Sequence, residues 1–161
     1  YNFSNTVLAK KTQPYKIFKI DGIDVGVFGI GIELDGLVTK PNYGETIYED
    51  PIKTANRIAA RLKNDYKCDL VICLSHLGYK YKEKKVSDLT LAYNSRNIDL
   101  ILGGHTHTLM PKPDELTNAD GKKVLVNQVG WAGIALGRVE YYFEPKKKGI
   151  VVANAPVKIG T

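Results

Sequence analysis

The chemically most informative residues of this sequence are its three histidines, His76, His105 and His107. Imidazole is the commonest side-chain ligand for transition metals. His105 and His107 are separated by one residue, and in an extended or looped backbone two rings at that spacing can point the same way. Any one of the three, taken alone, is better interpreted as a polar residue satisfied at a sheet edge. The three taken together favour a shared metal site.

Each histidine follows an apolar run that has the character of a buried strand. Leu70–Leu74 precedes His76, and Ile98–Leu102 precedes two glycines and then His105. Short apolar runs bounded by glycine are typical of strands covered on both faces, and the glycines allow a sharp turn at the strand end. Ligands bind at the carboxyl ends of such strands in α/β sheets. We therefore expect the histidines to meet at one edge of a sheet.

The first third of the chain predicts a hairpin followed by a long loop. Tyr15–Ile20 and Ile23–Ile30 are strand-like and flank an Asp-Gly turn. Gly26 and Gly29 in the second strand indicate close packing or a bulge. The stretch Gly31–Tyr48 has turn-rich composition, and we expect either a functional loop or a surface excursion there.

Two helices alternate with the histidine-bearing strands. Asp50-Pro51 predicts a helix start, and the residues at helical spacing that should face the sheet are Ile52, Ala55, Ile58, Ala59 and Leu62. Ser87 should cap a second helix whose inner stripe is predicted to be Leu89, Ala92 and Tyr93. This alternation of strand and helix predicts right-handed crossovers and a mixed or parallel sheet.

Beyond the histidines the pattern changes to β-structure. Pro111–Gly121 is predicted to be a polar loop, and three strands joined by short turns follow at Val124–Val129, Ile134–Phe143 and Ile150–Ile159. This meander suits a second sheet packed on the first. Trp131 lies between two of these strands and could line a site, although we favour a packing or turn-covering role.

Length and composition indicate one folded unit. The 161 residues are 43% hydrophobic and 25% charged, which is ordinary for a globular protein and excludes extensive disorder. No apolar run approaches the length needed to cross a membrane. The chain does not begin with Met, and Tyr1-Asn2-Phe3 is not a signal peptide, so we expect it to begin within a longer protein.

The two cysteines are not expected to form a disulfide. In a strand, Cys68 and Cys73 would have Cα atoms about 16 Å apart, too far for an S–S bond. Cys73 is therefore interpreted as a core residue and Cys68 as a free thiol.

The formal charge of +6 comes from lysines clustered in loops, as in Lys80–Lys85. We interpret these as solvated surface, with steering of a phosphate substrate as the alternative. No nucleic-acid-binding motif accompanies them.

Two strings resemble signatures of a known family. Ser75-His76-Leu77-Gly78 followed by Gly104-His105-Thr106-His107 is similar to the last two signatures of the calcineurin-like metallophosphoesterases, most closely the bacterial 5′-nucleotidase and 2′,3′-cyclic-nucleotide phosphodiesterase branch. The resemblance runs from Tyr1 to about Tyr142. It implies an α/β fold that is part of a four-layer α-β-β-α sandwich without its N-terminal portion. Residues 1–161 would then be a single partial domain, the second half of the catalytic domain.

The resemblance also implies two divalent metal ions, with His76 and His105 on one ion and His107 on the other. Nitrogen ligands and carboxylates together suit zinc, manganese, iron or cobalt better than calcium or magnesium. Gly103 and Gly104 would let the backbone approach the ions. The family's Asp-x-His, Gly-Asp and Gly-Asn-His-Asp/Glu motifs do not occur in this sequence, so its transition-state histidine would lie upstream. We therefore predict that this chain alone binds metal weakly and hydrolyses essentially nothing.

The leading hypothesis is a two-metal-dependent phosphoester hydrolase, with 5′-nucleotidase activity in the complete protein. One alternative is a 2′,3′-cyclic-nucleotide phosphodiesterase or another phosphomonoesterase, and another is a non-enzymatic module with a single zinc ion or structural histidines. The resemblance implies a nucleotide substrate, a separate C-terminal substrate-binding domain or subunit, and a periplasmic or otherwise extracytoplasmic location. No nucleic-acid partner and no membrane span are expected.

Overall fold

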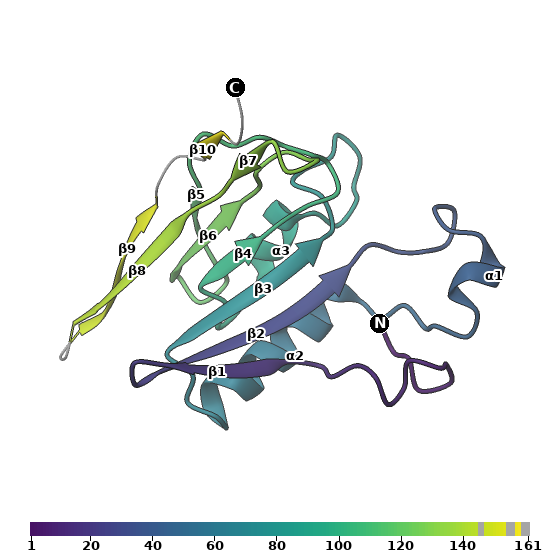
Figure 1. Ribbon diagram of the computed structural model, residues 1–161, viewed down its shortest axis with the longest axis horizontal. Coiled ribbons are helices and arrows are strands. Elements are labelled where there is room, and N and C mark those ends of the chain that lie inside the picture. Colours follow the sequence, from purple (N-terminus) through teal and green to yellow (C-terminus); the bar gives the residue numbers. More distant parts are fainter. Residues whose placement is uncertain (145–146, 154–156, 159–161) are drawn as a thin grey trace.

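A six-stranded sheet is the main feature of the computed structural model, which describes residues 1–144, 147–153 and 157–158 (Figure 1). In spatial order its strands are β1 (Lys16–Ile20), β2 (Ile23–Gly31), β3 (Leu70–His76), β4 (Leu100–Leu102), β6 (Lys123–Asn127) and β5 (Asp114–Thr117). The four central strands run parallel, and β1 and β5 pair antiparallel at the two edges. The predicted mixed α/β sheet is confirmed.

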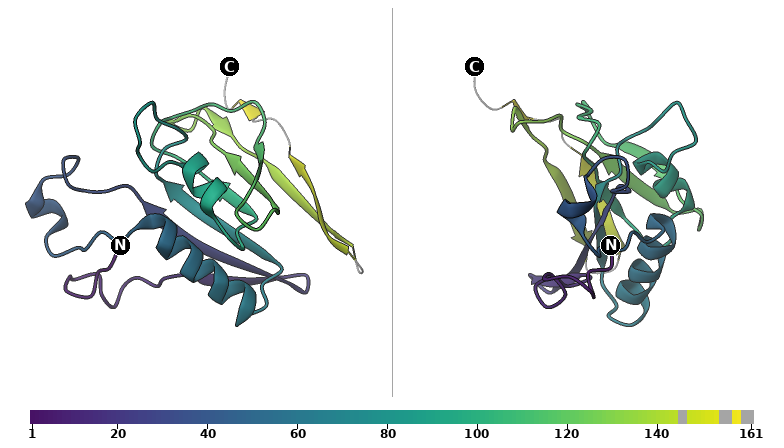
Figure 2. Two further views of the ribbon diagram at one scale, coloured as in Figure 1. Left: turned by 180° about the vertical axis from the view of Figure 1, so that it is seen from behind. Right: turned by 90° about the vertical axis from the view of Figure 1, so that its right-hand side faces the viewer.

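The helices are α1 (Lys40–Tyr43), α2 (Pro51–Asn64) and α3 (Asp88–Asn94). α2 and α3 cover the same face of the sheet, as the two views of Figure 2 show. Both begin at the predicted caps, because the side chain of Asp50 accepts a hydrogen bond from the backbone of Lys53 and that of Ser87 accepts one from Thr90. Within the part of the chain that the structure describes, no helix has both the length and the hydropathy needed to cross a bilayer.

The core lies between this face and the two helices, and contains both free cysteines. The α2 residues predicted to face the sheet are buried there, apart from the partly buried Ile52. The predicted inner stripe of α3 is partly wrong. Ala92 is buried as predicted, but Leu89 is only partly buried and Tyr93 is 54% exposed. The other buried residues of the helix are Asp88 and Leu91. The buried face of α3 includes its first residue, Asp88. A carboxylate therefore lies where helical spacing of hydrophobic residues would predict an apolar side chain.

The C-terminal strands are β7 (Ala135–Leu136), β8 (Val139–Glu144), β9 (Lys147–Ala153) and β10 (Val157–Lys158). β8 and β9 form an antiparallel hairpin on the side of the main sheet opposite the helices, as Figures 1 and 2 show. β7 pairs with β10. The expected second sheet is thus two separate two-stranded pairs, and part of the predicted strand Ile150–Ile159 lies outside the described residues.

Two further expectations for this region are corrected. The predicted strand Val124–Val129 joins the main sheet as β6, parallel to β4. The predicted loop Pro111–Gly121 contains the edge strand β5, whose only inward-packing apolar residue is Leu116. An edge strand needs one buried side chain and tolerates charge elsewhere, which is why its composition resembles that of a loop.

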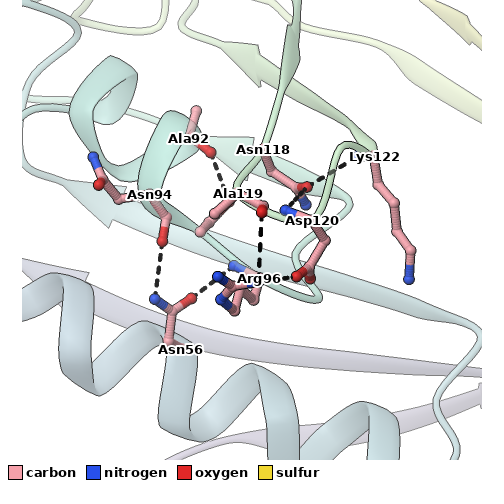
Figure 3. A network of polar contacts seen from close by, with 9 residues as sticks. Asn56, Ala92, Asn94, Arg96, Asn118, Ala119, Asp120 and Lys122 are labelled. Carbon is pink, nitrogen blue, oxygen red and sulfur yellow. Dashed lines mark hydrogen bonds and ion pairs between the residues drawn. The ribbon is translucent and has the colours of Figure 1, made fainter.

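A polar network joins the end of α3 to its neighbours (Figure 3). The Asn56 side chain on α2 donates to the carbonyl of Asn94 (3.0 Å) and accepts from the backbone of Arg96 (2.7 Å). Arg96 also pairs with Asp120 in the β5–β6 turn. The network therefore fixes the connection that leads from α3 into β4 and on to the second histidine segment.

Gly26 and Gly29 make a matched pair for testing how tightly β2 packs. A Cβ atom on Gly26 would lie 2.9 Å from both terminal methyl carbons of Leu62, which is fully buried, whereas one on Gly29 would lie 3.8 Å from its nearest neighbour. We predict that Gly26→Ala lowers the free energy of unfolding by about 1–3 kcal/mol through overpacking. Gly29→Ala should change it by less than about 0.5 kcal/mol. Urea unfolding of both variants checks this, and equal losses would contradict it.

Candidate metal centre

His76 and His105 come together at the carboxyl edge of the sheet. β3 ends at His76, and the neighbouring β4 ends at Leu102, which pairs in register with Leu74. Because the two strands are parallel, the segments that follow them lie side by side. The two imidazole rings are edge to face, with centroids 5.2 Å apart. The structure therefore confirms that these two histidines lie together, as the sequence predicted. Their role as ligands stays a prediction.

The backbone after β4 is strained at both of its histidines. His105 has φ = 73° and His107 has φ = 54°, in the left-handed region that is uncommon for residues other than glycine. The two rings are therefore not arranged by the simple alternation of an extended chain. His107 instead stacks on Trp131, with centroids 5.6 Å apart and planes at 15°.

Glycine at position 104 keeps room beside His76. A Cβ atom there would lie 3.4 Å from His76 Nδ1, at the border of ordinary van der Waals contact. A Cβ atom on Gly103 would collide with the carboxylate of Asp88. Close approach therefore requires glycine at position 103, whereas position 104 is only closely packed against His76.

The arrangement of His76 and His105 suits two ligands of one ion. A zinc ion about 2.1 Å from a nitrogen of each ring, at a tetrahedral angle of about 109°, would place the two centroids about 5 Å apart. The observed separation is 5.2 Å. Within the described residues no hydrogen bond ties up either imidazole, but no group of three His, Cys, Asp or Glu side chains is gathered for a metal ion there either. The separation of the two rings is compatible with one shared metal ion, and the described residues supply an incomplete ligand set.

The electrostatic surroundings favour the neutral form of His105. Its pKa is lowered, first by burial and then by the charges of His76, Lys85 and His107. A neutral imidazole has a free lone pair for a metal ion, whereas an imidazolium does not. His76 and His107 are exposed, so the site opens to solvent.

A buried glutamine, Gln128, is hydrogen-bonded to the loop that carries His105 and His107 (the histidine loop, residues 103–108). Gln128 is 1% exposed and directly follows β6. Its Nε2 atom donates to the carbonyl of Gly104 and to Asp88 Oδ2, both at 2.8 Å. Its Oε1 atom accepts from the backbone of Thr108 (3.1 Å) and the hydroxyl of Thr106 (3.2 Å). One side chain therefore fixes the loop on both sides of His105 and His107.

Asp88 connects this glutamine to the other histidine strand. It is fully buried at the start of α3, where Oδ1 accepts a 2.5 Å hydrogen bond from the hydroxyl of Ser75, the residue before His76. Burial raises its pKa to about 6, although the bonds from Ser75 and Gln128 and the nearby His76 act in the opposite direction. We did not predict Asp88 or Gln128 from sequence. The available signal for Gln128 was that it and Asn127 are polar residues in an otherwise apolar strand run.

The segment after His76 is fastened to the same loop. The backbone N–H of Tyr79 donates to the hydroxyl of Thr106 (2.9 Å), and the hydroxyl of Tyr81 donates to the carbonyl of Leu77 (2.6 Å). The lysines of this segment are exposed, as expected, and the ammonium of Lys85 lies 4.9 Å from the centroid of the Tyr81 ring. A positive charge is therefore held near His105.

The buried acid makes a pH-dependent contribution to stability in the metal-free protein. Because the folded pKa of Asp88 is about 6, above its ordinary value of 3.8, ionisation destabilises the fold. The loss is absent well below pH 3.8, grows as the pH rises toward 6, and is complete above pH 6. Relative to Asp88→Asn, the parent should lose about 3 kcal/mol of unfolding free energy between about pH 3 and pH 7.

Urea unfolding of both forms in a chelating buffer measures this difference. The nearby titratable groups Cys73, His76 and Tyr81 are common to both forms, so their contributions cancel to first order. A difference that does not change with pH would contradict the prediction.

Comparison with known proteins gives the site a context. No family model matches the chain. The trifunctional nucleotide phosphoesterase protein YfkN of Bacillus subtilis is 33% identical over 139 residues, which are 86% of this chain and 9% of that protein. The 5′-nucleotidase of Vibrio cholerae is 35% identical over 101 residues, 58% of this chain and 18% of that protein.

Solved structures agree with these relatives. The NAD nucleotidase of Haemophilus influenzae has a TM-score of 0.75 at 26% identity, covering 96% of this chain and 32% of that chain. The 5′-nucleotidase precursor of Thermus thermophilus also has a TM-score of 0.75, at 28% identity, covering 91% of this chain and 30% of that chain. This chain spans less than a third of the length of each of these relatives. It belongs to the calcineurin-like phosphoesterases of the 5′-nucleotidase branch and corresponds to a part of them.

Proposed function

We propose that the complete protein is a metal-dependent phosphoester hydrolase that acts on nucleotides, with a nucleoside monophosphate as the leading substrate and phosphate as a product. The observation that carries this proposal is the approach of His76 and His105 at the ends of two adjacent parallel strands. It is supported by the similarity of the chain to proteins named as nucleotide phosphoesterases and 5′-nucleotidases.

His76 and His105 are proposed as ligands of one divalent ion, and His107 as a ligand of a second. Imidazole ligands combined with carboxylates from the rest of the protein would suit zinc, manganese, iron or cobalt. Such ions, when bound, supply Lewis-acid activation of a phosphoryl group and of water. The lowered pKa of His105 supports a ligand role, because it keeps the imidazole neutral near pH 7.

Residues of this chain would also attract the substrate. Lys80, Lys82, Lys84 and Lys85 are exposed on the segment that follows His76. Their charge raises the local concentration of a phosphate dianion at the carboxyl edge of the sheet. The contacts of Tyr79 and Tyr81 hold this segment in place, so its charge stays beside the histidines.

We further propose that residues 1–161 are the second half of a catalytic domain and that the remaining ligands come from elsewhere in the complete protein. The described residues bring two imidazole rings to one position, and the nearest buried acid, Asp88, is already bonded to Ser75 and Gln128. Divalent ions held without carboxylates keep their full charge uncompensated, so this chain alone should bind them weakly.

An extracytoplasmic location is also proposed for the complete protein. The supporting observation is that the relative from Thermus thermophilus is named a precursor. Cell fractionation of the native host checks it, and recovery of the protein in the cytoplasmic fraction would contradict it.

Activity measurements test the proposed function directly. With added Mn²⁺ or Zn²⁺, the complete protein should release phosphate from adenosine 5′-monophosphate, and the 161-residue chain should not exceed metal in buffer. Turnover by the chain alone would overturn the proposed sharing of ligands. No turnover by the complete protein on any phosphate ester would overturn the function.

A broader nucleotide phosphoesterase is the second candidate, because the Bacillus subtilis relative is named trifunctional. Adding adenosine 2′,3′-cyclic monophosphate to the same assay separates the two candidates. Preference for the cyclic ester would support the phosphodiesterase alternative.

Metal stoichiometry of the complete protein tests the division of ligands. His76→Ala and His105→Ala should each remove the same ion, so the double variant loses no more than either single variant. His105→Ala combined with His107→Ala should remove both ions, because their ligand sets are proposed to be separate. Elemental analysis after dialysis measures the count, and Lys82→Ala is a control on the exposed lysine segment.

One ion per chain in the parent would contradict a dinuclear centre and favour the single-zinc module instead. Thermal unfolding of each metal-free variant shows whether a lost ion reflects a lost ligand or a lost fold.

A further inference from the structure

Trp131 is a large aromatic side chain left at the surface beside the candidate centre. Its side chain is 61% exposed, and its indole lies nearly parallel to the ring of His107, with centroids 5.6 Å apart. It is the only tryptophan of the sequence. The exposure excludes the core position that the sequence offered for this residue, and leaves the turn-covering and site-lining alternatives. An exposed indole gains little from burial, and its specific contact is the one with His107.

The backbone holds the two rings face to face. The N–H of Gly130 donates to the carbonyl of Thr108 (3.0 Å), and Leu109 pairs with Val129 in an antiparallel bridge. These links join the residue before Trp131 to the residue after His107. On the other side, the carbonyl of Trp131 accepts from the N–H of Ile134 (3.2 Å), which closes the turn. The stack is therefore set by both chain segments.

His107 lacks the usual means of fixing a metal-binding imidazole. Such a ring commonly donates its second N–H to a carboxylate or carbonyl, which sets its orientation. Within the portion of the chain that the structure describes, the His107 ring has no hydrogen-bond partner, and its contact is the stack on Trp131. Its backbone is also strained, at φ = 54°, a conformation that persists only where neighbours enforce it.

We propose that Trp131 is a positioning residue that fixes the ring plane of His107 for the second divalent ion; this inference rests on the proposed function. Coordination draws electron density from an imidazole, and an electron-poor ring is attracted more strongly to the face of an indole. Stacking and metal binding at His107 therefore reinforce each other. The same coupling makes the indole a spectroscopic reporter of that ion.

The stack is first tested without metal. In the metal-free complete protein, the ring current of the indole should shift the His107 carbon-bound protons upfield in NMR spectra. Trp131→Leu should abolish this shift, and Trp131→Phe should keep part of it. Because Trp131 is mostly exposed, both variants should unfold at nearly the parent temperature. Identical His107 shifts in the parent and Trp131→Leu would overturn the proposal.

Titration with Zn²⁺ then tests the coupling. The parent minus the Trp131→Phe variant gives the emission of Trp131 alone, and this emission should change as Zn²⁺ binds. The change should disappear in His107→Ala. By calorimetry, Trp131→Leu should weaken the ion held by His107 about two- to fivefold and leave the ion held by His76 and His105 unchanged.

The outcomes separate the two proposals. A parent that binds no Zn²⁺ overturns the proposed function and this inference with it. A parent that binds two ions with unchanged affinity in Trp131→Leu, or with a silent Trp131, overturns only the positioning role. Equal weakening of both ions would indicate a general structural effect, which also contradicts the proposal.

Discussion

The contact between Gln128 and Asp88 determines how the candidate site is put together. It joins the end of β6 to the start of α3, and each partner continues to one of the histidine segments. Asp88 reaches the hydroxyl of Ser75 beside His76, and Gln128 reaches the loop on both sides of His105. Buried polar groups of this kind are expensive unless they are satisfied, and here every bond also positions a histidine. The positions of the histidines at the carboxyl edge of the sheet therefore depend on the packing of the core.

The strain in the histidine loop follows from this coupling. Two non-glycine residues in the left-handed region oppose folding by about 1–3 kcal/mol each. The bonds from Gln128 to Gly104 and Thr108, together with the bridge of Leu109 to Val129, hold the loop in that conformation. The strain is concentrated where the side chains must be aimed, as is common at functional sites.

The framework of the site could be predicted from sequence, because it depends on local signals. The apolar runs before His76 and His105, the cap at Ser87 and the Asp-Pro start of α2 each act over a few residues. What could not be predicted depends on contacts between distant segments. Asp88 looks like an ordinary acid in the first turn of a helix, and only the approach of β3 and β6 makes it a buried link. Trp131 is exposed because its partner is His107, which no periodicity reveals.

The charges of the described residues explain why this edge needs a second contributor. His76 and His105 carry no negative charge, and the exposed lysines after His76 add positive charge, which repels a divalent cation as readily as it attracts phosphate. The one buried carboxylate nearby, Asp88, has both oxygens engaged in hydrogen bonds to Ser75 and Gln128. Under the proposed function, the negative charge that stabilises the ions would come from another segment of the complete protein. When such a segment contributes its ligands, the rings of His76 and His105 are already ordered by this fold. Metal binding would then not have to supply the free energy of ordering them.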